Sequence, residues 1–253
     1  MRGVAAVIVW LGLIVLALPV AAQIPATCAV PPATLTFESS KCERTFTAKE
    51  GQRKPDSYLL AVSWSPGFCG RVSPEKPQFN WQCQKNSFAW VVHGLWPQYN
   101  TGGWPEYCQD TAGVPAALVR EQLCFIPGDQ LVQCAWAKHG TCTPFTQDEY
   151  FAKTRAVFNS INFPSALSEQ LKKEGKIKTQ ELLDALQKAN PTVPANSIAL
   201  SCRDRRFFQE VRFCLNTDLK PQQCQNVRKS CTAPTLFVGK PTVKKDESHA
   251  KTY

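Results

Sequence analysis

The chain has 253 residues, twelve cysteines and a formal net charge of +9 at pH 7. This length suffices for one domain with a substantial core, and the even number of cysteines allows six disulfides with no obligatory free thiol, as in proteins of oxidising compartments. The positive charge favours polyanionic partners such as nucleic acid, heparin-like sugars or anionic membrane surfaces, although a solvated lysine-rich face would give the same charge.

The N-terminus has the composition of a targeting segment. Arg2 precedes an apolar run from Val4 to Leu18, and small residues follow up to Ala22. The run is shorter than the ~20 residues that a membrane-spanning helix needs. We therefore expect residues 1–22 to be a signal peptide, cleaved after Ala22, and not an anchor. The mature protein would carry a charge of +8, be secreted or periplasmic, lack a membrane anchor and act as a monomer.

The remaining chain predicts a single domain with flanking segments. Residues 23–56 are proline-rich and should form an N-terminal extension that Cys28 and Cys42 attach to the domain. The domain itself should cover residues 57–239. Residues 240–253 are charged and lack an apolar pattern, so we expect a disordered tail.

Strand and helix patterns follow one another along this domain. A buried strand is predicted over residues 57–64 and another over 87–92, which should stop because Gly94 and Pro97 interrupt the pattern. A helix over residues 131–139 should end at Gly140 as a C-terminal cap. The other predicted elements are helices at 115–123, 165–174 and 179–189, a helix that begins with a capping box at Thr146 and Glu149, and strands at 198–202, 210–215 and 235–238. Strands at both ends with helices between them predict an α+β fold: a central antiparallel sheet backed by helices and cross-linked by disulfides.

Two of the three histidines lie beside glycines at the expected ends of such elements. His93 lies in the segment Trp90–Pro97, and His139 follows Lys138 in the segment Trp136–Cys142. Two imidazoles can take and give protons in one reaction, and a lysine can stabilise an oxyanion on phosphorus. The pattern suits metal-free RNA cleavage, in which one histidine deprotonates the ribose 2′-OH and the other protonates the leaving 5′-oxygen. Taken alone, His93 could equally be a core histidine beside core tryptophans.

Together, the two histidine segments resemble the active-site segments of the ribonuclease T2 family, and the preceding segment Ser63–Cys69 fits the same family. The resemblance covers about residues 55–240 and implies an exported bacterial α+β endoribonuclease that cleaves single-stranded RNA through 2′,3′-cyclic phosphate ends, with no cofactor and no metal. It implies that His139 is the general base, His93 the general acid and Lys138 the group that stabilises transition-state charge. The candidate substrate-binding residues are Trp96, Gln98, Tyr99 and Trp104, whose aromatic members offer faces on which bases can stack. The resemblance also implies the disulfides Cys108–Cys142 and Cys202–Cys231.

The chain departs from the family pattern at two positions. Family members usually carry His-Glu-Trp at the start of the second segment, where this chain has Cys134, Ala135 and Trp136. A glutamate at 135 would lie one helical turn before His139 and could orient its imidazole, which Ala135 cannot do. The acidic residues that could replace it are Glu106, Asp110 and Glu121. Gln98 stands where an acidic base-recognition residue is common, so the family's base preference is not carried over.

Three other interpretations follow from the same residues. A catalytically impaired RNA-binding or inhibitory protein on the same fold is the main alternative, because of Ala135. Cys134, His139 and Cys142 resemble part of a zinc site, and Cys134 could serve a cysteine peptidase, but an oxidising compartment favours disulfides over both. Spacing alone suggests the local disulfides Cys69–Cys83, Cys124–Cys134 and Cys214–Cys224.

Overall fold

The computed structural model describes residues 28, 42, 54–225, 227 and 230–239. The expected signal peptide, most of the expected extension and the expected tail lie outside these residues. In the part of the chain that is described, no helix combines the length and apolar character needed to cross a membrane.

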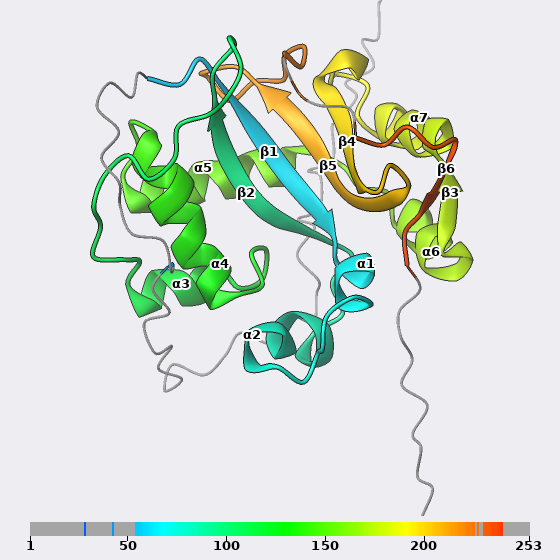
Figure 1. Cartoon of the computed structure of the whole chain (residues 1–253), viewed down its shortest axis with the longest axis horizontal. Coiled ribbons are helices and arrows are strands. Elements are labelled where there is room, and N and C mark those ends of the chain that lie inside the picture. The colour runs from blue at the N-terminus through cyan, green and yellow to red at the C-terminus, as the bar shows by residue number, and fades with distance from the viewer. Residues whose placement is uncertain (1–27, 29–41, 43–53, 226, 228–229, 240–253) are drawn as a thin grey trace, which may run out of the picture.

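A six-stranded sheet forms the centre of the domain (Figure 1), and its strand order is β2-β1-β5-β6-β3, with β4 also pairing with β5. The pairs are antiparallel except for a short parallel contact between β5 and β6. The expected α+β fold with a central, largely antiparallel sheet is therefore confirmed. The strands are β1 (Ser57–Trp64), β2 (Trp90–Gln98), β3 (Lys176–Lys178), β4 (Ile198–Arg203), β5 (Phe207–Leu215) and β6 (Thr235–Phe237).

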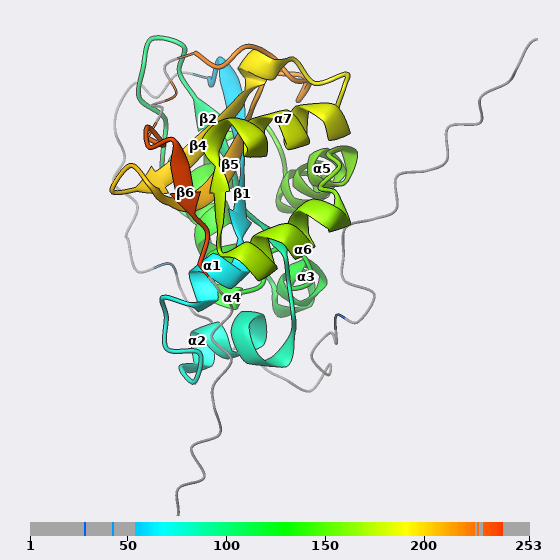
Figure 2. The same ribbon diagram turned by 90° about the vertical axis from the view of Figure 1, so that its right-hand side faces the viewer.

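The predicted helices are all present. They are α3 (Ala116–Gln122), α4 (Asp129–Cys134), α5 (Gln147–Ser160), α6 (Ser165–Glu174) and α7 (Thr179–Ala189), and Figure 2 shows α5, α6 and α7 together on one side of the sheet. The predicted capping box begins α5: the Glu149 backbone N–H donates to Thr146 Oγ1 at 3.3 Å, and the Thr146 backbone N–H donates to the Glu149 carboxylate at 2.9 Å. Shorter elements that the sequence did not predict are α1 (Ser65–Cys69), α2 (Pro77–Asn80), a π-helical turn (Trp81–Lys85) and a 3₁₀ turn (Ala195–Ser197).

The two faces of the sheet have different roles. Leu60 and Val62 on β1, with Phe213 and Val211 opposite them on β5, are almost fully buried in the core beneath the helices. Side chains alternate between the faces of a strand, so Glu210 and its cross-strand partner on β1 point to the other face. That second face carries the polar groups of the candidate site.

Strand β2 does not end at His93, as the sequence predicted, but continues to Gln98. Val62 pairs with Val92 and Ala61 with Gly94, which leaves His93 as the extra residue of a β-bulge. Pro97 is tolerated because β2 is at one end of the strand order, where a missing N–H interrupts no further pairing. Glycine is needed at 94 because a Cβ there would collide with the indole of Trp96. A bulge, and not a strand end, presents the histidine.

The second histidine lies at the end of a longer helical segment. Helix α4 continues as a π-helical turn (Ala135–His139) and then a 3₁₀ turn (Gly140–Cys142). Gly140 is the C-cap residue of the π-helical turn, as predicted, and its backbone is right-handed, with φ −60° and ψ −41°. The glycine is required for packing, since a Cβ at this position would collide with the ring of Trp136.

All twelve cysteines form disulfides. The predicted pairs Cys69–Cys83, Cys108–Cys142, Cys202–Cys231 and Cys214–Cys224 are confirmed. The predicted pair Cys124–Cys134 is wrong, because Cys124 bonds Cys28 and Cys134 bonds Cys42. These two bridges attach the N-terminal cysteines to the domain, as expected from the sequence.

Candidate active site

The two histidine segments meet at Trp96. The ring centroid of His93 is 5.1 Å from that of Trp96, and the ring centroid of His139 is 5.5 Å from it. The guanidinium of Arg212, on β5, lies over the same indole at 5.4 Å. The β2 bulge and the end of the π-helical turn thus bring two imidazoles, far apart in sequence, against one aromatic ring.

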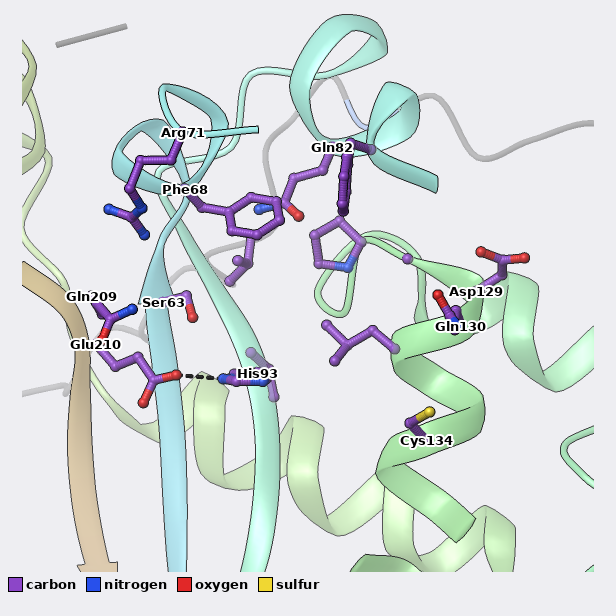
Figure 3. Close-up of a pocket in the computed structure, with 16 residues that line it drawn as sticks. Ser63, Phe68, Arg71, Gln82, His93, Asp129, Gln130, Cys134, Gln209 and Glu210 are labelled. Atoms are coloured by element: carbon purple, nitrogen blue, oxygen red, sulfur yellow. Dashed lines mark hydrogen bonds and ion pairs between the residues drawn. The ribbon is translucent and has the colours of Figure 1, made fainter. Parts of the chain in front are cut away.

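A buried carboxylate holds the first histidine (Figure 3). Glu210 on β5 contacts His93 Nδ1, and its second oxygen lies 3.0 Å from Arg212 Nε. Burial by itself would raise the pKa of Glu210, but the hydrogen bond with His93 and the positive charges of His93 and Arg212 lower this pKa below its ordinary value. Glu210 is therefore an anion at neutral pH. It fixes the His93 ring through Nδ1 and leaves Nε2 as the atom that can exchange a proton with a substrate.

The second histidine has a different environment. His139 Nδ1 is sealed from solvent and has no hydrogen-bond partner among the described residues. Burial, then the positive charges of Lys138 and His93, lower the pKa of His139 to about 3. His139 is therefore neutral over most of the pH range, and a neutral imidazole can accept a proton.

No carboxylate occupies the place that the family glutamate would have. Ala135 is 3% exposed and packs in the hydrophobic core. Of the acidic residues that the sequence suggested as substitutes, Glu106 pairs with Lys138, and Asp110 accepts a hydrogen bond from the Thr111 backbone N–H at 2.9 Å. Glu121 lies on α3. The carboxylate that the structure brings to a site histidine is instead Glu210, and it serves His93.

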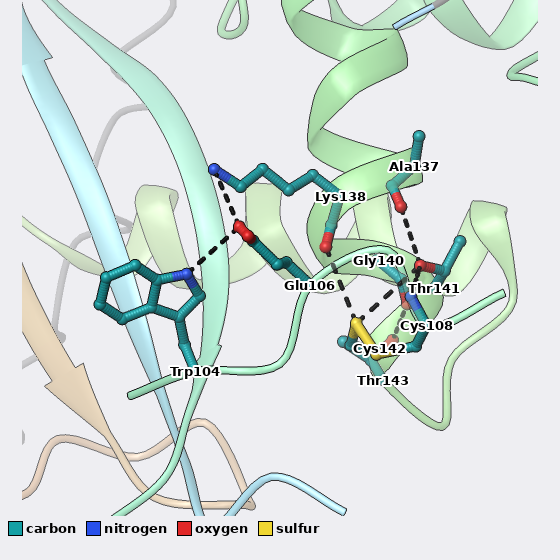
Figure 4. The surroundings of a disulfide bond; sticks show 9 residues. All are labelled: Trp104, Glu106, Cys108, Ala137, Lys138, Gly140, Thr141, Cys142 and Thr143. Carbon is teal, nitrogen blue, oxygen red and sulfur yellow. Dashed lines mark hydrogen bonds and ion pairs between the residues drawn. A yellow bond between two sulfur atoms is a disulfide. The ribbon is translucent and has the colours of Figure 1, made fainter. Parts of the chain in front are cut away.

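Lys138 and Trp104 converge on one acidic side chain (Figure 4). Lys138 Nζ lies 3.2 Å from Glu106 Oε2, and Trp104 Nε1 donates to the same oxygen at 3.3 Å. The Cys108–Cys142 disulfide ties this loop to the turn that follows His139. Trp104 remains 56% exposed, so its indole is held beside the site with much of its surface available to a ligand.

The two other substrate-binding candidates lie where β2 ends. The Gln98 side-chain amide donates to the backbone carbonyl of Pro97 at 2.9 Å and, more weakly, to that of Trp96 at 3.4 Å. Tyr99 begins a turn in which its backbone N–H donates to the carbonyl of Gly103 at 3.1 Å. The Gln98 side chain therefore folds back on its own strand, whereas Trp96 contacts both histidine rings and Trp104 shares the Glu106 carboxylate with Lys138.

A cavity of about 430 Å³ opens beside His93. This volume is in the range of small-molecule sites. Figure 3 shows side chains from β1, α1, α4 and β5 around it. Its lining includes Ser63, Phe68, Arg71, Gln82, Asp129 and Glu210.

Sequence reasoning missed Glu210 and Arg212 as site residues. The alternation of Glu210 and Arg212 with Val211 and Phe213 is typical of a half-buried strand, yet Glu210 is only 6% exposed. This alternation predicts on which face of the sheet a side chain lies, but it does not predict which other residues pack against that face.

The disulfides overturn two rival hypotheses. Cys134 and Cys142 are both bridged, so neither can supply a thiolate to a zinc ion shared with His139. For the same reason Cys134 cannot be the nucleophile of a peptidase.

Comparisons with known proteins agree with the family expectation. The model of the Ribonuclease T2 family matches residues 55–224. A probable ribonuclease of Haemophilus influenzae is 33% identical over 184 residues, which are 68% of this chain and 61% of that relative. A ribonuclease of Aeromonas hydrophila is 29% identical over 163 residues, covering 64% of this chain and 73% of the relative. These two bacterial relatives fit the expected bacterial source.

Solved structures share the fold. An RNase-related protein from Calystegia sepium superposes with a TM-score of 0.56 at 23% identity, covering 74% of this chain and 98% of its own. Ribonuclease MC1 from bitter gourd seeds gives a TM-score of 0.53 at 19% identity, with 72% and 100% covered. The match of the family model to most of the domain, on a fold shared with these structures, shows that this chain belongs to the ribonuclease T2 family.

Proposed function

We propose that this chain is an exported endoribonuclease that cleaves single-stranded RNA by transphosphorylation, leaving 2′,3′-cyclic phosphate ends without the help of a metal ion. The observation that carries the proposal is the meeting of His93 and His139 at Trp96, with Lys138 beside them. Family membership and the six disulfides, which suit an oxidising compartment, support it.

The contrasting environments of the histidines support separate roles. His139 is uncharged at neutral pH because its pKa is lowered, and the uncharged imidazole is the form that can take the proton of the ribose 2′-OH, although a lower pKa also makes it a weaker base. His93 faces the anionic Glu210, which offsets the charge of a protonated imidazole, and so it is suited to protonate the leaving 5′-oxygen. Such a separation of environments is how an acid and a base are assigned within one site.

The lysine and the aromatic side chains would act on the rest of the substrate. Lys138 would leave Glu106 to stabilise the negative charge that develops on phosphorus. Trp104, which is the more exposed indole, offers a face for a base, while Trp96 already contacts both imidazoles and Arg212. The cavity beside His93 would hold a second base.

The test is cleavage of a single-stranded RNA oligonucleotide by the purified disulfide-bonded protein in excess EDTA, with identification of the product ends. We expect 2′,3′-cyclic phosphates, and we expect His93→Ala and His139→Ala each to lower kcat by at least about 10²-fold while RNA affinity changes little. Lys188→Gln, an exposed change on α7, is the control for handling and charge.

The outcomes separate the candidate functions. RNA binding without cleavage between pH 4 and 8 would favour the impaired binding protein, for which buried Ala135 and the unpartnered His139 Nδ1 are the structural arguments. Cleavage that EDTA abolishes would refute the metal-free reaction. A histidine variant with substantial activity would show that its role is misassigned.

A further inference from the structure

A second group of cationic and aromatic side chains surrounds the turn between β4 and β5. The Arg206 backbone N–H donates to the Arg203 carbonyl at 3.3 Å, and the two residues between them, Asp204 and Arg205, have φ values of +48° and +65°. This is the geometry of a tight hairpin turn that favours Asn-Gly. The turn instead carries charged side chains, and residues 203–206 are all exposed.

The register places this turn on the same sheet face as Glu210. Ser201 pairs with Glu210, the register then shifts at a bulge, and Cys202 pairs with Phe208 and Arg203 with Phe207. Cys202 and Phe208 are buried in the core on the helix side. Since neighbouring residues of a strand point to opposite faces, Arg203 and Phe207 point away from the helices, as Glu210 does.

Two phenylalanines lie among these arginines. The rings of Phe207 and Phe237 are 5.8 Å apart with 38° between their planes, and Phe237 is 44% exposed. The guanidinium groups of Arg203 and Arg206 lie 5.3 and 5.2 Å from the Phe207 ring centroid. Lys176 on β3 pairs with Phe237 across the ladder and is also exposed. Two arginines therefore contact the Phe207 ring, and the neighbouring Phe237 ring is presented to solvent.

The electrostatic balance of this surface is strongly positive. Six lysine or arginine residues and one acidic residue, Asp204, lie in this region, which comprises residue 71 and the segments 176–178, 203–207 and 235–239. Asp204 lies 3.5 Å from Arg203, but both side chains are more than half exposed, so this ion pair is weak and screened by salt. We refer to Arg203, Arg205, Arg206, Phe207 and Phe237 as the Arg–Phe surface.

The Arg–Phe surface adjoins the candidate active site on one face of the sheet, where β5 carries both Phe207 and Glu210. Arg71 lines the cavity beside His93 together with Gln209 and Glu210. Partial burial, and then the positive charge of Arg203, lower the pKa of Arg71, so the two guanidinium groups are electrostatic neighbours. Phe207 is three residues from Glu210 along β5, or about 10 Å at the rise of a strand.

We propose that the Arg–Phe surface binds the single-stranded RNA that continues from the cleavage site, with the arginines at phosphates and Phe237 stacking on a base. The proposal rests on the proposed function. Positive grooves with exposed aromatic rings are how proteins hold single strands without sequence preference. Charge alone would also suit an anionic membrane or a sulfated sugar, but the exposed ring and the position beside the candidate active site favour RNA.

The test compares substrates that can and cannot reach this surface. The variants are Arg203→Gln/Arg206→Gln and, separately, Phe237→Ala, and the matched control is Lys188→Gln/Lys220→Gln, which removes two exposed charges elsewhere. KM and kcat are measured for a 20-nucleotide unstructured RNA and for a dinucleoside monophosphate. Unfolding midpoints show whether each variant is folded.

We expect the arginine variant to raise KM for the long RNA by about tenfold, and to reduce the slope of log affinity against log salt by about 1.4, the value for two phosphate contacts with a single strand. Phe237→Ala should raise the same KM about fivefold. Neither variant should change kcat or KM for the dinucleoside. The control, Lys188→Gln/Lys220→Gln, should leave kcat and KM unchanged for both substrates.

Other outcomes would overturn the proposal. These are an unchanged KM for the long RNA, an equal change for the dinucleoside, or an equal change in the control. Loss of binding to phosphatidylserine vesicles or heparin, with RNA affinity retained, would assign the surface to those ligands. If the parent protein cleaves neither substrate, the proposed function fails, and fluorescence anisotropy of labelled RNA still tests the surface by direct binding.

Discussion

Replacing Glu210 by glutamine is the sharpest test of the site geometry. Glutamine has the same shape but no charge, so it removes the anion that contacts His93 and Arg212. If His93 is the general acid, its protonated form loses its partner. We expect kcat to fall about 10²-fold, in the range of one acid–base contribution, while KM changes less than kcat, because glutamine keeps the shape that Glu210 gives to the cavity lining.

The stability change should be smaller than for a fully buried ion pair. Loss of one partner of a buried pair costs about 3–5 kcal/mol. Here the side chains of His93 and Arg212 are 42% and 24% exposed, so water can solvate both when the carboxylate is gone. We therefore expect the unfolding free energy to fall by only about 1–2 kcal/mol, which leaves a folded enzyme for kinetics.

The assay is the pH dependence of kcat/KM on a dinucleoside substrate. In Glu210→Gln, kcat/KM should be lower than in the parent across the pH range, and Glu210→Asp should restore part of the activity. Glu169→Gln, which removes an exposed carboxylate from α6, is the matched control. A folded Glu210→Gln protein with the parent's kcat and pH profile would refute the positioning role.

Three further predictions concern the other charged and buried groups. The pKa of His139 is lowered to about 3 from an unfolded value near 6.5, so between these pH values the unfolded chain binds a proton that the folded chain does not. The free energy of unfolding should therefore fall by about 1.4 kcal/mol per pH unit as the pH drops from 6.5 towards 3. Urea unfolding of the parent protein and of His139→Gln measures this fall, which the variant should lack. Glu106→Gln frees Lys138 and should raise RNA affinity about threefold at low salt and not at high salt, as anisotropy titrations would show. Ala135→Glu buries a carboxylate in the core and should lower stability by about 3 kcal/mol more than Ala135→Gln, without raising kcat; a higher kcat would mean that the new carboxylate reaches His139.

The features predicted correctly from the sequence are those fixed by local chemistry. The Thr146–Glu149 capping box, the helices with apolar periodicity and the buried β1 strand all depend on residues close together in the chain. The same is true of Cys69–Cys83 and Cys214–Cys224, which close short loops. The prediction failed for Cys124 and Cys134, because their partners lie 96 and 92 residues away and spacing holds no information about them.

The errors at the site have one physical origin. Gly94 and Gly140 were interpreted as breaks in a strand and a helix, whereas both make room for a neighbouring indole ring. The alternation around Glu210 is typical of a half-buried strand, whereas Glu210 is buried and pairs with His93 and Arg212. The indoles lie only two and four residues from these glycines, whereas Glu210 and His93 are far apart in sequence. In each case residue type and spacing indicate which residue matters but not which side chain it contacts.

The charges of the two regions imply different contributions to RNA binding. In the candidate active site, Glu106 opposes Lys138, and Glu210 opposes Arg212 and His93, so the net charge of these five residues is at most about one positive unit even when His93 is protonated. Such paired cations are held in place for chemistry but attract a distant phosphate weakly. The segments around the Arg–Phe surface carry five more positive than negative side chains, largely exposed. It follows that the salt dependence of RNA association should arise mainly at that surface, whereas kcat should depend on the paired groups and little on salt.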